Sequence, residues 1–151
     1  MDETQAKKSG SEILAIQRQE ADTELDRPAL ALALSGLSAG LDVGFSLLLM
    51  AVFSHLLVDS PAPLRDVAVA LSYSVGFLFV VLGRSELFTE HTTMDILPVL
   101  NGQKKLASLA RLWVIVFCAN LVGAALFAAA AAFIGPALKI FPAPVLGEIA
   151  R

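Results

Sequence analysis

Long apolar runs separated by short polar stretches dominate this chain, and they predict helices that cross a membrane. Three runs, at residues 28–57, 67–83 and 112–138, are long enough or nearly long enough to span. A helix needs about 20 apolar residues to cross a hydrocarbon core. Asp42 is the only acidic residue within them. The pattern therefore predicts an all-α membrane protein with three transmembrane segments.

The two ends of the chain read differently from its middle. Residues 1–27 carry seven acids and four bases and are expected to form a polar, solvated tail, at most partly ordered. The less favoured alternative is that Ile13, Leu14 and Ile16 form one amphipathic turn on the membrane or on a partner. Residues 139–151, rich in proline, are expected to be an interfacial or periplasmic segment. Residues 28–138 then form the three-helix membrane repeat.

The middle of the chain holds more residues than one straight crossing needs. Almost 40 residues separate Arg65 from Lys104, about twice the length of a spanning helix. A polar stretch at 84–93 follows the second apolar run, and a short apolar run at 94–100 follows it. This pattern predicts that a loop breaks the second span, as in transporters that place substrate sites at discontinuous helices. Gly83 is expected to permit the break, and the returning half-helix is expected to be capped by Thr92, Thr93 or Asp95.

Composition and charge exclude several classes of function. Hydrophobic residues make up 56% of the chain and charged residues 17%, and the mean hydropathy of +0.72 favours a membrane protein. The net charge of -3 gives no basic surface for nucleic acid. A single cysteine, Cys118, rules out an intrachain disulfide and a cysteine zinc site. Seven lysines and arginines lie in the N-terminal tail or in the linker before the third span, which predicts a cytoplasmic N-terminus.

Several short strings resemble the formate/nitrite transporter family. They are Leu37-Ser38-Ala39-Gly40, Gly83-Arg84-Ser85-Glu86-Leu87-Phe88-Thr89, Asn101-Gly102, Arg111-Leu112-Trp113-Val114-Ile115-Val116 and Asn120-Leu121-Val122-Gly123. The resemblance covers roughly residues 30–135. It implies an aquaporin-like unit of six helices, built as two inverted three-helix repeats, of which this chain holds the first. It also implies a pentamer in the inner (cytoplasmic) membrane that passes small monovalent anions such as formate, nitrite or hydrosulfide, without a cofactor.

The resemblance also implies roles for residues in the loop. Leu87 and Phe88 would shape a constriction of the pore, and Thr89 would offer its hydroxyl to the anion. Gly83 and Glu86 would support the loop. Two features depart from the family pattern, namely Glu90-His91 after the threonine and the arginine at position 84. The identity of the anion is therefore left open. Four side chains are therefore candidates for a polar pore or an interface: Asp42, Arg84, Glu90 and His91.

Other residues have simpler interpretations. Gly36, Gly40 and Gly44 recur every four residues, which lets another helix approach closely, and Asn120 and Gly123 are expected to pack on the same pattern. Asp42 is costly in lipid, so it is expected to face the protein interior, either in a structural pairing or in the pore.

Two alternatives to a transporter remain open at this point. A metal cluster formed by Glu86, Glu90, His91 and Asp95 would make the chain a membrane metalloprotein, although a single histidine is a poor ligand set, so no metal is expected. A non-conducting membrane partner is the other alternative, because the pore histidine and the anion-attracting lysine of the family belong to a second repeat. The chain is expected to be the N-terminal portion of a longer transporter or a truncated relative. No enzymatic activity is expected.

Overall fold

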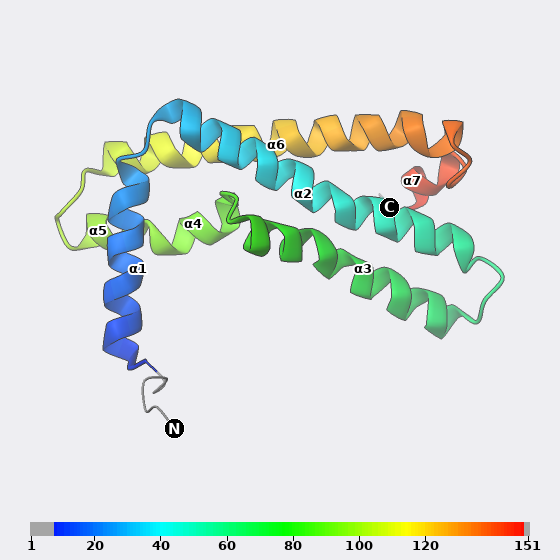
Figure 1. Ribbon diagram of the computed structural model, residues 1–151, viewed down its shortest axis with the longest axis horizontal. Helices are drawn as coiled ribbons and strands as arrows, with labels where there is room; N and C mark the ends of the chain where they lie inside the picture. The colour runs from blue at the N-terminus through cyan, green and yellow to red at the C-terminus, as the bar shows by residue number, and fades with distance from the viewer. Residues whose placement is uncertain (1–7, 150–151) are drawn as a thin grey trace, which may run out of the picture.

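The computed structural model describes residues 8–149, whose regular secondary structure is entirely α-helical. The helices are α1 (Gly10–Leu25), α2 (Ala29–Leu56), α3 (Ala62–Gly83), α4 (Phe88–Met94), α5 (Ile96–Leu100), α6 (Leu106–Ala137) and α7 (Pro144–Ile149). Figure 1 shows α2 and α6 running in the same direction, while α3, α4 and α5 return in the opposite direction. Together the long helices form an elongated bundle.

Three of these helices, α2, α3 and α6, are long and apolar enough to cross a membrane. The predicted all-α membrane protein with three spans is therefore confirmed. Two of the spans begin earlier than their apolar runs. Pro61 ends an extended segment and starts α3 at Ala62, and Lys105 does the same for α6 at Leu106. Polar residues such as Arg65 and Arg111 are accommodated because they lie in the first turns, where a spanning helix meets water.

Helix α2 lies between α3 and α6 and packs against both (Figure 1). A Cβ atom added to Gly40 would overlap the backbone of Asn120 on α6, and one added to Gly76 on α3 would lie 2.7 Å from the Cα of Val43. Glycine at these positions lets the helices touch backbone to backbone. Buried apolar side chains fill both ends of the bundle: Leu25, Leu32, Leu109, Leu112 and Val116 at one end, and Ala51, Phe141 and Val145 at the other.

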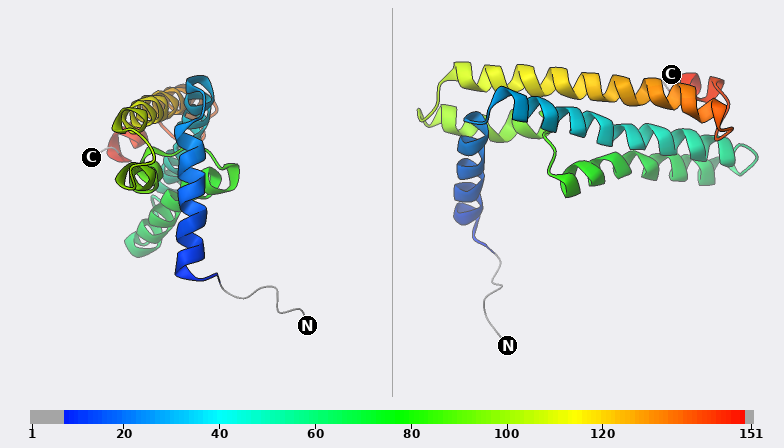
Figure 2. Two further views of the ribbon diagram at one scale, coloured as in Figure 1. Left: turned by 90° about the vertical axis from the view of Figure 1, so that its left-hand side faces the viewer. Right: turned by 45° about the horizontal axis from the view of Figure 1, so that its top comes forward.

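The N-terminal segment is a helix where a solvated tail was expected. Helix α1 begins with a capping box, in which Glu12 N–H donates to the Ser9 hydroxyl and Ser9 N–H donates to the Glu12 carboxylate. Its last turns bury Ala21 and Leu25. Figures 1 and 2 show α1 standing across one end of the bundle. The expectation of a tail was wrong for residues 10–25, because too few apolar residues marked the buried side of this helix.

Ion pairs fasten α1 to the turn before α6. Lys104 Nζ lies 2.6 Å from a carboxylate oxygen of Asp26 and 3.4 Å from one of Asp22. The hydrogen bond to Asp26 raises the pKa of Lys104 above its ordinary value. These contacts fix the end of α1 that leads into the first span.

Residues 139–149 include a short helix where a loop or interfacial segment was expected. Helix α7 folds back on α2, and Phe141 packs against Ala51 and Gly135. Lys139 adopts a positive φ of 58° where the chain turns at the end of α6. The segment is therefore packed on the bundle through residue 149.

Candidate functional site

The candidate site is the break between α3 and α4, near the end of the bundle that carries α1 (Figure 1). Helix α3 ends at Gly83, and Arg84 takes the left-handed conformation, with φ 49° and ψ 41°. The N–H groups of Arg84 and Ser85 both donate to the carbonyl of Val80. The chain then continues without regular structure to Leu87, and helix α4 begins at Phe88.

Two expectations about this break were wrong. Gly83 does not supply the left-handed residue, because it is still helical and a Cβ there would lie 3.8 Å from the nearest atom, a carboxylate oxygen of Asp42. Thr92 and Thr93 lie inside α4, which restarts the chain at Phe88, and Asp95 occupies the N-cap position of α5 without a side-chain cap hydrogen bond. The hydroxyl of Thr92 instead donates to the carbonyl of Thr89, 2.9 Å away.

Asn120 on α6 joins α2 to the break through its side-chain amide. Its Nδ2 donates to the carbonyls of Gly36, at 2.8 Å, and Glu86, at 2.9 Å. Its Oδ1 accepts the N–H of Phe88, also at 2.9 Å. One side chain therefore bonds a carbonyl of α2 and two main-chain groups of the break, the Glu86 carbonyl and the Phe88 N–H, as a buried break in an apolar bundle requires.

Helix α2 holds the other side of the break. The Ser35 hydroxyl accepts the N–H of Glu86 at 3.1 Å. Farther along α2, a carboxylate oxygen of Asp42 accepts the hydroxyl of Ser85 at 2.9 Å. Asp42 thus pairs with the loop, the structural alternative that the sequence left open for it. Ser85 and Glu86 are both buried.

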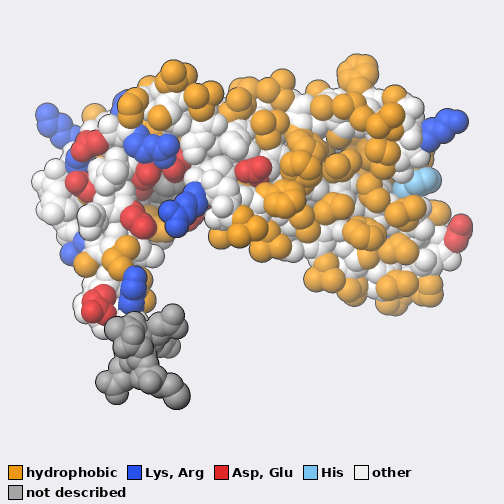
Figure 3. Space-filling view, in the orientation of Figure 1, with side chains coloured by type: hydrophobic (Ala, Val, Ile, Leu, Met, Phe, Trp, Pro, Cys, Tyr) orange, Lys and Arg blue, Asp and Glu red, His pale blue; other side chains and the backbone are white. Residues whose placement is uncertain are grey.

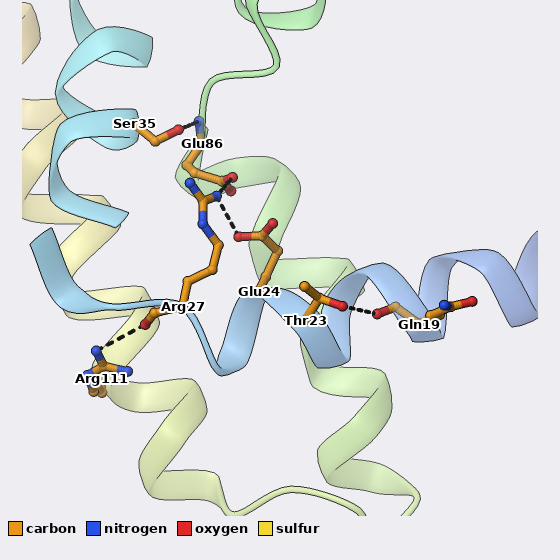
Figure 4. Close-up of polar contacts among 7 residues, drawn as sticks. All are labelled: Gln19, Thr23, Glu24, Arg27, Ser35, Glu86 and Arg111. Atoms are coloured by element: carbon orange, nitrogen blue, oxygen red, sulfur yellow. Dashed lines mark hydrogen bonds and ion pairs between the residues drawn. The ribbon is translucent and has the colours of Figure 1, made fainter. Parts of the chain in front are cut away.

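A charged group closes the site on the side of α1. Arg27 lies between two carboxylates, 2.5 Å from Glu86 and 2.7 Å from Glu24, as Figure 4 shows. The hydrogen bond that Arg27 donates to Glu24 raises the pKa of Arg27, and attraction to both carboxylates adds to the effect, while partial burial opposes it. A side-chain nitrogen of Arg111 donates to the Arg27 carbonyl. The linker between α1 and α2 is therefore tied directly to the loop.

The three residues expected at the pore lie on one side of these contacts. Leu87 and Phe88 are half-buried, and Thr89 is exposed in the first turn of α4. The Phe88 ring packs edge-on against two α6 rings, with centroids 5.1 Å from Phe117 and 6.4 Å from Trp113. The exposed residues Arg84 and Glu90 flank them, while the side chain of His91 lies outside the described part of the structure.

A cavity of about 500 Å³ lies beside the break, between α1, the end of α3 and α4. Figure 3 shows acidic and basic side chains gathered around this region, whereas apolar side chains cover the long helices. The ionisable lining residues are Glu20, Glu24, Arg27, Arg84, Glu86, Glu90 and Asp95. The loop therefore borders a cavity lined by charged side chains.

The metal-cluster alternative loses its geometric premise. It required Glu86 and Glu90 one helical turn apart, but Glu86 precedes α4 and is held by Arg27 and Ser35. Among the described residues, no three His, Cys, Asp or Glu side chains are grouped so that they could hold a metal ion.

Sequence reasoning missed three of the side chains that hold the break. Ser35, Ser85 and Arg27 were not singled out, and Asn120 was expected only to pack. The signal for Ser35 and Asn120 was their polarity within apolar runs, since a polar side chain facing lipid would lack a partner. The signal for Arg27 was weaker, because its partner lies 59 residues along the chain.

Comparisons with known proteins agree with this architecture. A family profile described as formate/nitrite transporter matches residues 11–150. The chain is 37% identical over 108 residues to the inner membrane protein YfdC of Escherichia coli, covering 70% of this chain and 34% of that protein. It is 29% identical over 109 residues to the formate channel FocA of Haemophilus influenzae, covering 72% of this chain and 38% of that protein. The chain thus spans about a third of the length of these relatives, and no solved structure matches it.

Proposed function

The chain belongs to the formate/nitrite transporter family, and we propose that it provides part of a path for small monovalent anions across a membrane. The substrate class follows the name of the family and of its relative FocA, a formate channel. Formate and nitrite are the anions to test first.

The break between α3 and α4 is the observation that carries this proposal. Irregular backbone at membrane depth is tolerated where it is buried in protein or lines a water-filled space. Here Asn120, Ser35 and Asp42 satisfy the loop from the side of the other two spans. The opposite side leaves Thr89 exposed next to the half-buried Leu87 and Phe88. A hydroxyl that can donate a hydrogen bond, placed beside apolar side chains that limit hydration, suits a weakly bound anion.

The proposed path is completed by more than the described residues. In the proposed arrangement, this three-helix unit faces a second, inverted unit, and the anion passes between their broken helices. Five such pairs form a ring. We place the protein in the inner membrane with its N-terminus in the cytoplasm, because the positively charged residues gather at the end of the bundle that carries α1.

Replacing Thr89 tests the proposed path. Thr89→Ala removes the exposed hydroxyl. The main-chain carbonyl of residue 89 can still accept the Thr92 hydroxyl, so the fold is expected to persist. Losing one hydrogen bond to a charged group is expected to lower formate or nitrite flux into liposomes roughly tenfold or more. Thr23→Ala is the matched control, since the Thr23 hydroxyl donates within α1 to Gln19 (Figure 4). Equal flux in both variants and the wild type would remove Thr89 from the path.

A further inference from the structure

Two arginines line the cavity beside the break, and their surroundings differ. Arg27 is held by the carboxylates of Glu24 and Glu86. Arg84 is exposed, and within residues 8–149 its guanidinium makes no hydrogen bond or ion pair. The cavity therefore contains one guanidinium that is neutralised and one that is available to a ligand.

The backbone of Arg84 indicates that its side chain has a use. Its φ of 49° is a left-handed conformation that favours glycine. A residue with a Cβ costs about 1 kcal/mol there. Neither a structural contact of the guanidinium nor the turn itself requires arginine. Together with the position of Arg84 at the charged cavity, where Lys139 does not lie, this conformation points to a functional constraint.

We propose that Arg84 binds the transported anion at the cavity, and that its guanidinium favours planar anions with two oxygens, such as formate and nitrite, over spherical anions of equal charge. This inference rests on the proposed anion transport. A guanidinium presents two parallel N–H groups that match two oxygens of one planar anion. A spherical anion, such as chloride or hydrosulfide, cannot use this geometry.

The acidic residues around the cavity sharpen the selectivity. Glu24 and Glu86 are compensated by Arg27, whereas Glu20 and Glu90 are exposed to solvent. Their repulsion grows in proportion to the charge of the ligand. Attraction to Arg84 doubles for a divalent anion as well, but Glu20 and Glu90 outnumber this guanidinium, so the net repulsion of a divalent anion is about twice that of a monovalent one. Arg84 beside exposed carboxylates therefore favours anions with a single negative charge.

Direct titration of the Arg84 side chain tests this site without requiring transport. The full chain in lipid nanodiscs is titrated with sodium formate or sodium chloride at constant ionic strength, and the Nε–H resonance of Arg84 is followed by NMR. We expect a saturable shift with formate at a concentration roughly fivefold lower than with chloride. A shift that does not saturate, or equal responses to both anions, would overturn the proposal.

Three variants separate charge from geometry, with formate binding measured by the change in its ¹³C relaxation. Arg84→Gly suits the left-handed backbone and should lose the saturable binding, with no loss of thermal stability. Arg84→Lys keeps the charge and should bind formate and chloride about equally. Lys139→Gly is the matched control, because Lys139 is also exposed with a positive φ, at the far end of α6, and it should bind formate as the wild type does. Wild-type binding in Arg84→Gly would refute the site.

Failure of this inference differs from failure of the proposed function. If formate binds at Arg84 but wild-type liposomes show no flux, transport is refuted and the binding site stands. If flux occurs while formate leaves the Arg84 resonance unchanged, the proposed function stands and Arg84 is not its binding residue.

Discussion

Asn120 is the residue on which the geometry of the break depends most. Its amide connects the carbonyl of Gly36 in α2 with the carbonyl of Glu86 and the N–H of Phe88 in the loop. An amide is suited to this role because it donates and accepts at once. A hydroxyl or a carboxylate at this position could not form the same three bonds.

Asn120→Ala is expected to loosen the break. Each buried polar group left without a partner costs about 1–3 kcal/mol, so the variant should melt at a lower temperature than the wild type in the same detergent. Hydrogen exchange at the Phe88 N–H should also become faster. Asn101→Ala is the control, because Asn101 lies exposed in the turn after α5. Unchanged melting and exchange in Asn120→Ala would show that the amide does not hold the loop.

Contacts between whole helices set where these side chains lie. The close approach of α2 and α6 depends on Gly40, whose missing Cβ leaves room for the backbone of Asn120 and Ala124. Gly36 and Gly44 face α6 in the same way, toward Ala119 and Phe127 respectively. Because Asn120 is on α6, any separation of the two helices also draws the amide away from the break.

Gly40→Val is expected to separate α2 from α6. The added side chain would overlap the α6 backbone, which cannot move as a flexible side chain can. Overpacking of this kind costs about 1–3 kcal/mol, so the melting temperature and the yield of folded protein should fall. Gly83→Ala is the matched control, since a Cβ there meets only ordinary contacts. If both variants melt at the same temperature as the wild type, the α2–α6 contact is not close enough to require glycine.

The capping box of helix α1 contains a carboxyl group, that of Glu12, which titrates in acid. The hydrogen bond that the Ser9 N–H donates to the Glu12 carboxylate lowers the pKa of Glu12 below its ordinary value. A carboxyl group whose pKa is lowered by folding stabilises the folded form above its unfolded pKa, and this contribution is lost as the pH falls through the folded pKa. The first turn of α1 should therefore fray below about pH 4.5, seen as faster exchange of the Ser9 amide after correction for the intrinsic rate.

Glu12→Gln provides the control for this titration. Glutamine can accept the Ser9 N–H in a capping box but carries no titrating group. The corrected exchange of Ser9 should then be independent of pH between 3 and 6. An equal acid response in Glu12→Gln would assign the fraying to another group.

The sequence predicted some of these elements for physical reasons. Apolar runs indicated the three spans, because a hydrocarbon core demands long apolar helices. The surplus of chain between Arg65 and Lys104 indicated the interruption of the second span. Helix α1 was missed because only Ala21 and Leu25 mark its buried side.

The details of the break could not be predicted from local sequence. The left-handed residue fell on Arg84 and not on Gly83, because contacts from other helices decide where α3 ends. Ser35 and Asn120 reach the loop from positions 51 and 32 residues away in the chain. Local propensity carries no information about such partners. The sequence therefore indicated candidate residues more readily than the hydrogen bonds that these residues form.

At the scale of the whole molecule, polarity is divided along the bundle. Apolar side chains cover the long helices, and charged side chains gather at the end that carries α1, with a few at the opposite end (Figure 3). The break lies near the charged end, beside the cavity (Figure 1). This arrangement suits an entrance at which an anion leaves water and meets the broken helix. It accounts for the location of the proposed path at the charged end of a bundle of apolar spans.

The measurement that tests the central claim most directly is anion flux through liposomes that contain the complete proposed path, this three-helix unit together with the second, inverted unit. Uptake of ¹³C-labelled formate, and of nitrite in a parallel experiment, is compared with uptake by protein-free vesicles of the same lipid composition. The account predicts flux above the protein-free level for both anions, and lower flux in Thr89→Ala than in Thr23→Ala. Flux no greater than that of protein-free vesicles, from protein shown to be folded and inserted, would contradict it.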